Sequence, residues 1–194
     1  MKHIGIDYGS KMAGTTAIAY LEGNSLHFAQ SQKKKDADAF VKNWVTEHQP
    51  QTVFLDAPLS LPGVYTQPAS HEDYFYRAGD RLLKAMSPMF LGGLTARAMK
   101  LSRALEQQRI SVVETYPSRL ADVLALDRKR YKKDKAYLPV AASIVVQQMH
   151  RLQLTEAPAN WHQVDALLAF CSGWRYQQGL HELYGEASEG VIVV

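Results

Sequence analysis

Short apolar runs and helical repeats alternate along the chain in the order of a layered α/β domain. Residues 2–7, 15–21 and 25–30 carry alternating or β-branched apolar positions, and turn residues separate them. We therefore expect these three segments to form an antiparallel meander. Residues 52–55 and 110–114 are short and largely apolar, as expected of buried strands in the same mixed sheet.

Apolar residues at helical spacing predict that helices flank this sheet. The predicted helices cover residues 36–48, 72–86, 94–107, 117–126, 139–152 and a last segment that begins at Asn160. Asn160 is a favourable N-cap, and Gln163 stands at the capping-box position. Residues 190–194 are expected to form a short closing strand or an ordered tail. At 194 residues we expect a single domain over 1–194, with a helical insertion at about 64–108 after the fourth strand.

Composition is that of a globular protein. Hydrophobic residues make up 46% and charged residues 21% of the chain. No apolar run approaches the roughly 20 residues that a membrane-spanning helix needs, and the apolar N-terminal stretch is too short for a signal peptide. We therefore expect a cytoplasmic protein with no membrane partner. The single cysteine, Cys171, has no partner for an internal disulfide and is predicted to be buried.

Four acidic residues fall where these elements would gather them at one edge of the sheet. Asp7, Asp56 and Glu114 each end an apolar run, and Asp165 lies early in the last predicted helix. Gathered carboxylates bind hard divalent cations, and two Mg²⁺ or Mn²⁺ ions about 3.5 to 4 Å apart can activate a water for phosphodiester hydrolysis. Taken singly, each aspartate also has a structural explanation, such as capping a turn or lying at the solvent margin of a helix.

The order of elements is that of a ribonuclease H-like fold, a mixed β-sheet flanked by helices. GIDYGSKMAG resembles the opening strand and turn of the RuvC and YqgF-type resolvases and nucleases. The joint order of FLDAPLSLP, the R-x-x-D-R of residues 77–81, VVETYPSRL and VDALLAF is similar to the DUF429 family of predicted nucleases. This resemblance covers residues 4–170 and the Glu189-Gly190 turn. It departs from the DUF429 pattern at residues 8–11, where the turn is closer to the YqgF form.

The resemblance implies a metal-dependent nuclease that uses Mg²⁺ or Mn²⁺. Its catalytic and metal-binding residues would be Asp7, Asp56, Glu114 and Asp165. Its partner would be nucleic acid, either DNA or RNA, and the resolvase-type relatives make a homodimer worth testing. Two other functions stay open: a non-catalytic nucleic-acid-binding or scaffold protein with the same fold, and a nucleotide-binding phosphotransfer domain of the sugar-kinase and actin type. The second is disfavoured because those proteins duplicate the domain, whereas this chain has room for one copy.

Basic residues are clustered, although the net charge is only +3. Residues 127–135, reading DRKRYKKDK, carry six basic side chains, a pattern typical of solvated surface but also of segments that follow a phosphate backbone. The candidates for phosphate contact are Lys11, Arg77, Arg81 and Lys135. For Arg77 and Arg81 an intrahelical ion pair with Asp80 is the alternative, and Lys135 is a candidate through the family resemblance alone. His71, His150 and His162 lack zinc-ligand spacing.

Overall fold

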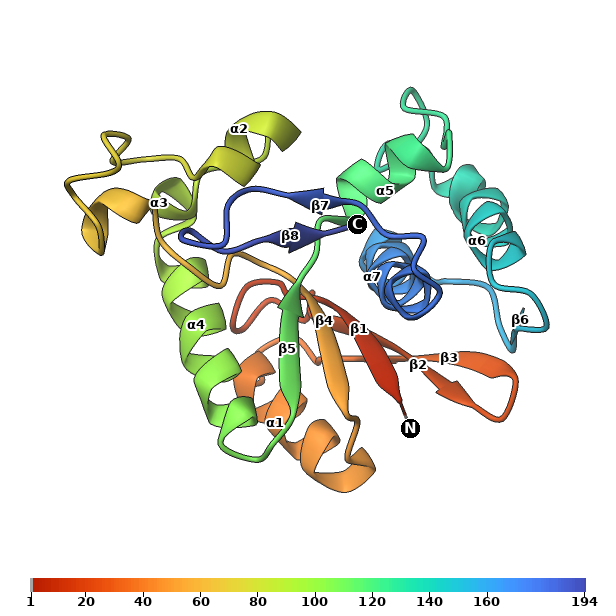
Figure 1. The fold of residues 1–194 in the computed structure, drawn as a ribbon. Coiled ribbons are helices and arrows are strands. Elements are labelled where there is room, and N and C mark those ends of the chain that lie inside the picture. Colours follow the sequence, from red (N-terminus) through yellow and green to blue (C-terminus); the bar gives the residue numbers. More distant parts are fainter. Residues whose placement is uncertain (1) are drawn as a thin grey trace.

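A six-stranded mixed sheet lies at the centre of the computed structural model, which describes residues 2–194 (Figure 1). The strands are β1 (His3–Asp7), β2 (Ala17–Glu22), β3 (Ser25–Gln30), β4 (Thr52–Asp56), β5 (Ser111–Glu114) and β6 (Gln153–Leu154). Their spatial order is β5-β4-β1-β2-β3-β6, with β1, β2 and β3 antiparallel in turn and with β4 and β5 parallel to β1. This confirms the predicted meander and the ribonuclease H-like class of fold.

Two short segments outside the predicted strands, residues 153–154 and 183–184, also pair, the second of them with the predicted closing strand at residues 190–194. β6 adds to the edge strand β3 over two residues, too few to show periodicity in the sequence. β7 (Leu183–Tyr184) and β8 (Ile192–Val193) form a separate antiparallel ribbon. A single bridge from Thr115 to Val193 joins this ribbon to the end of β5, so the C-terminal end of the chain lies beside the carboxyl ends of the central strands (Figure 1).

Helices cover both faces of the sheet (Figure 1). One face packs against α1 (Ala37–His48) and α4 (Gly93–Glu106), through a core that includes Ile4, Ile6 and Leu55. On the other face α7 (Trp161–Gln177) packs against the strands, and α5 (Pro117–Val123) and α6 (Leu138–Gln147) pack against α7. The shorter elements are η1 (Gly63–Tyr65), α2 (Ala78–Leu83), α3 (Pro88–Leu91) and η2 (Lys135–Tyr137). Over residues 2–194, no helix combines the length and apolar character needed to cross a bilayer.

The helix predicted over residues 72–86 is much shorter in the structure. The Asp73 carboxylate accepts the backbone N–H groups of Phe75 and Tyr76, at 2.8 and 3.0 Å, which holds this segment in a turn. The Asp80 carboxylate then accepts the backbone N–H of Arg77, so that α2 begins only at the next residue. Local side-chain hydrogen bonds therefore override the helical spacing of residues 72–77.

Helix α7 crosses β1 in backbone contact at Gly5. The adjacent residues of β1 pack on the α1 and α4 face, so Gly5 faces α7. A Cβ atom built on Gly5 would lie 2.0 Å from the backbone nitrogen of Phe170 and 2.4 Å from the carbonyl oxygen of Ala166. The missing side chain thus sets how closely α7 approaches the strand that ends at Asp7.

Replacing Gly5 with alanine should destabilise the protein by about 3 kcal/mol, because the added methyl group meets backbone atoms that no rotamer change can move. The same substitution at Gly93 is a matched control, since a Cβ there meets nothing within 4 Å and Gly93 begins α4. Gly93→Ala should leave the free energy of unfolding unchanged or raise it slightly. Urea unfolding of the two variants measures the difference, and equal stabilities would contradict the close α7 contact.

Candidate metal centre

Strand register places Asp7 and Asp56 side by side. They are opposite each other at the carboxyl ends of the parallel strands β1 and β4. The preceding residues, Ile6 and Leu55, are fully buried in the α1 and α4 core, so the two aspartates project towards α7. Near the N-terminal end of α7, Asp165 completes the group. One oxygen from each of the three carboxylates lies within 4.8 Å of the others.

Two of these three carboxylates already have polar partners. Nδ1 of His162 lies 2.7 Å from Oδ2 of Asp7. Both oxygens of Asp165 are engaged: the Lys132 ammonium lies 2.7 Å from Oδ2, and the Tyr131 hydroxyl donates to Oδ1. Among residues 2–194 no hydrogen bond or ion pair reaches the Asp56 side chain. Both side-chain oxygens of Asp56 and the second oxygen of Asp7 are therefore without a protein partner among these residues and available as metal ligands.

Burial and repulsion from neighbouring carboxylates oppose the ionisation of Asp56 and of Asp165. Burial, and then the neighbouring charges of Asp7 and Asp165, raise the pKa of Asp56 well above its usual value. Burial also raises the pKa of Asp165 to about 6, although its ion pair with Lys132 opposes the shift. Burial alone would lower the pKa of the Lys132 ammonium, but Asp165, Asp56 and Asp7 together outweigh this effect and the pKa is raised. A cation among the three carboxylates would relieve the repulsion.

Asp7 and Asp56 line a hollow of about 230 Å³ that also takes in Met86 and Leu94. Thr115 also lines this hollow, and over residues 2–194 its buried hydroxyl has no hydrogen-bond partner. A buried unpaired hydroxyl is unfavourable, and a ligand or metal-bound water could satisfy it. The residues present therefore suit a hard divalent cation: oxygen ligands, excess negative charge and a free hydroxyl beside an apolar wall.

The structure corrects the prediction that Glu114 joins this group as a metal ligand. In β5, Glu114 is opposite Leu55, not Asp56, so its side chain projects to the α4 face of the sheet. Its carboxylate also lines the hollow, but both oxygens are bound. Arg77 donates to Oε2 at 2.7 Å and to Oε1 at 2.5 Å, and the backbone N–H of Leu59 donates to Oε2 at 2.8 Å.

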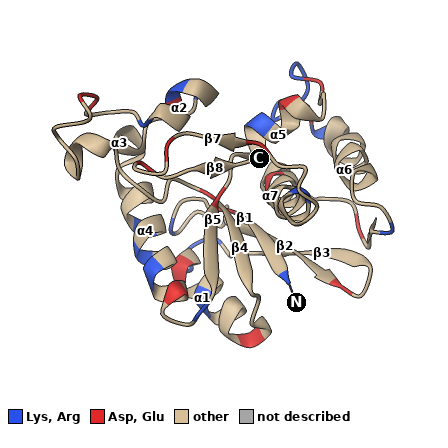
Figure 2. Cartoon of the chain, in the orientation of Figure 1, with Lys and Arg blue, Asp and Glu red and all other residues tan. Residues whose placement is uncertain are grey.

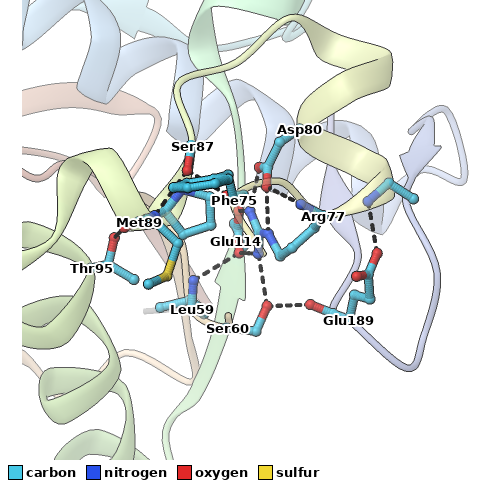
Figure 3. Close-up of polar contacts among 12 residues, drawn as sticks. Leu59, Ser60, Phe75, Arg77, Asp80, Ser87, Met89, Thr95, Glu114 and Glu189 are labelled. Carbon is cyan, nitrogen blue, oxygen red and sulfur yellow. Dashed lines mark hydrogen bonds and ion pairs between the residues drawn. The ribbon is translucent and has the colours of Figure 1, made fainter. Parts of the chain in front are cut away.

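Arg77, predicted to contact phosphate, instead lies at the centre of this buried network (Figure 3). Its side chain is 1% exposed. Besides Glu114 it binds Asp80, with Nη2 to Oδ1 at 2.7 Å and Nε to Oδ2 at 2.9 Å, and Ser60, with Nη1 to Oγ at 2.8 Å. The alternative of an ion pair with Asp80 is thus the arrangement observed for Arg77, and its guanidinium group is not available to substrate.

Glu189 holds the two ends of the segment between η1 and α2 (Figure 3). Its carboxylate accepts the backbone N–H groups of Gly63 and Ala78, each at 2.7 Å, and its carbonyl oxygen accepts from the Ser60 hydroxyl. The chain that follows Asp56 is therefore fastened to the network of Arg77 and Glu114. This network supports the position of the hollow without adding to the group of three carboxylates.

The other predicted phosphate contacts are on the surface. Lys11 pairs with Asp36 at 3.2 Å, and Arg81 pairs with Asp73. Lys135 is exposed at the start of η2. Their binding to substrate stays a prediction. Figure 2 shows basic segments on the loop that follows α5. Within that loop Lys132 forms an ion pair with Asp165. The basic run at residues 127–135 was the feature of the sequence that pointed to this contact.

Comparison with known proteins finds solved structures that are similar to this one. No protein-family model matches this chain, and no curated protein matches it. A solved structure of RuvC from Thermus thermophilus is 18% identical, with a TM-score of 0.49 over 93% of this chain and 98% of that one. A structure of T. thermophilus RuvC in complex with a Holliday junction substrate is 16% identical, with a TM-score of 0.47 over the same shares of the two chains.

Proposed function

We propose that this protein is a divalent-metal-dependent nuclease that hydrolyses phosphodiester bonds of nucleic acid. The observation that carries this proposal is the convergence of Asp7, Asp56 and Asp165 from two strand ends and a helix. Mg²⁺ or Mn²⁺ is the proposed cofactor, since both prefer oxygen ligands. Bound there, such an ion would activate a water for in-line attack and stabilise the leaving oxygen. The motif resemblance to the DUF429 family of predicted nucleases stays a prediction from the sequence, since no family model matches this chain.

The side chains divide into ligands and substrate-binding groups. Asp7 and Asp56 offer the freest oxygens at the hollow, and Asp165 approaches from α7. Lys11, Arg81 and the exposed lysines of residues 127–135 are the proposed phosphate contacts, because mobile surface cations bind nucleic-acid backbones of many sequences. The four-carboxylate, two-ion site expected from the sequence is reduced here to three carboxylates, because Arg77 binds Glu114.

Cleavage of a panel of end-labelled nucleic acids tests this function. Single-stranded, duplex, hybrid and branched DNA and RNA should be incubated with purified protein in Mg²⁺, in Mn²⁺ and in EDTA. We expect at least one substrate to be cleaved with either metal ion and none to be cleaved in EDTA. Salt-sensitive binding that needs no metal and yields no product would instead identify a non-catalytic nucleic-acid-binding protein. Neither binding nor cleavage across the panel would contradict both functions.

A further inference from the structure

Lys132 is paired with Asp165, one of the three carboxylates of the acidic group. Its ammonium lies 2.7 Å from Oδ2 of Asp165, while the Tyr131 hydroxyl donates to Oδ1. Tyr131 is buried, and the Lys132 ammonium also lies 5.2 Å from the centre of its ring. Asp165 is thus bound on both oxygens by two consecutive residues of one loop.

The backbone conformation of the loop directs the Lys132 side chain to Asp165. Lys132 has a φ of +63°, in the left-handed region that non-glycine residues adopt at some cost. The backbone N–H of Tyr131 donates to Asp127 at 2.8 Å and closes the turn before Lys132, and the backbone N–H of Asp134 donates to Arg130 at 2.8 Å and closes the turn that contains Lys132. The adjacent Lys133 is exposed and lies outside the ion pair with Asp165. The strained residue is the one whose side chain reaches the site.

The free ligand atoms suit one divalent ion better than two. Two ions at about 3.5 to 4 Å need several carboxylates that can bridge or flank them. Here Asp165 is bound on both oxygens and Asp7 on one, and Glu114 is bound by Arg77 on the other face of the sheet. The charge balance also favours one ion. Three carboxylates are neutralised by one ammonium and one divalent cation, whereas two divalent ions would leave an excess of positive charge.

We propose that Lys132 supplies the second positive charge of the site, so that the protein holds one divalent ion where a two-ion nuclease holds two. This inference rests on the proposed function. The ion would bind through Asp7 and Asp56, with Lys132 holding Asp165 beside them. Lys132 would also be placed to contact a phosphate oxygen of a bound strand, as a point charge with three donors.

Counting bound Mn²⁺ tests the inference without any substrate. The free-ion signal in electron paramagnetic resonance should be followed while Mn²⁺ is titrated into the wild-type protein and into Lys132→Met, Lys132→Arg and Lys133→Met. We expect one bound ion per chain in the wild type and in the Lys132→Arg and Lys133→Met variants. Lys132→Met frees Oδ2 of Asp165 and removes the competing charge, so it should bind two.

The outcomes separate this inference from the proposed function. Two ions in the wild type, or an unchanged count in Lys132→Met, would overturn the role of Lys132 while leaving the nuclease proposal in place. Loss of all binding in Lys132→Met would also overturn it, since the lysine would then only position Asp165. If the wild type binds no Mn²⁺ at all, the proposed function itself fails. Lys132 is 46% exposed, but Lys132→Met leaves the buried Asp165 without its cation, so circular dichroism of each variant should verify the fold before the bound ions are counted.

Discussion

Replacing Asp7 with asparagine should lower metal-dependent cleavage by about a thousandfold or more. Asp7 is adjacent to Asp56 on the central pair of parallel strands and keeps one oxygen without a protein partner. The amide has the same shape but lacks the negative charge that attracts a divalent ion. Cleavage rates in Mg²⁺, measured beside the affinity for Mn²⁺, should both fall.

The fold of Asp7→Asn should be unaffected, because the substitution removes one of the charges that raise the pKa of Asp56. Urea unfolding is therefore expected to show equal or slightly greater stability. Asp122→Asn is the matched control, since Asp122 is 40% exposed and pairs with Arg128 on the surface. That variant should cleave at the wild-type rate. Full activity in Asp7→Asn would exclude the carboxylate group as the catalytic centre.

Replacing Arg77 with methionine should lower the free energy of unfolding by about 3 to 5 kcal/mol. The substitution leaves Glu114 and Asp80 buried at 7% and 1% exposure with no cation between them. The control is Arg81→Met in α2, the helix that Arg77 precedes. Arg81 is 63% exposed and its ion pair with Asp73 lies at the surface, so this variant should lose less than about 1 kcal/mol. Similar losses in the two variants would contradict the central position of Arg77.

The loss in Arg77→Met should also depend on pH. Burial raises the pKa of Glu114 already, while Arg77 opposes the shift, so the pKa rises further when Arg77 is removed. A carboxyl group with a raised folded-state pKa stabilises the fold below its unfolded pKa, and this contribution is lost as the pH rises through the folded-state value. The deficit relative to wild type should therefore shrink when unfolding is measured at pH 5 instead of pH 7.

The strands and their acidic ends were predictable from local pattern, but the face on which each carboxylate projects was not. In the strand register Asp7 is opposite Asp56, whereas Glu114 is opposite Leu55, the residue before Asp56. In a strand, a shift of one residue turns a side chain to the other face of the sheet. Sequence alone gives the order of strands, while the relative register of two parallel strands joined by a long helical insertion depends on packing.

The specific contacts made by Lys132 and Arg77 were not predictable from the sequence. The basic run at residues 127–135 was evident, yet the lysine that reaches Asp165 is selected by a left-handed backbone at Lys132. Nor could helical spacing foresee that Arg77 would turn inwards, because its partner Glu114 is 37 residues away in the chain. His162, three residues before Asp165, was noted in the sequence, and it contacts Asp7.

The contact of α7 with β1 at Gly5 also bears on when the acidic group can form. Asp7 and Asp56 lie at the ends of β1 and β4, whereas Asp165 belongs to α7, which is synthesised more than 100 positions after Asp56. During synthesis a growing chain therefore holds only two of the three carboxylates until α7 has emerged and docked on the sheet. A nascent chain still attached to its ribosome and messenger RNA would lack a complete cation site until that step.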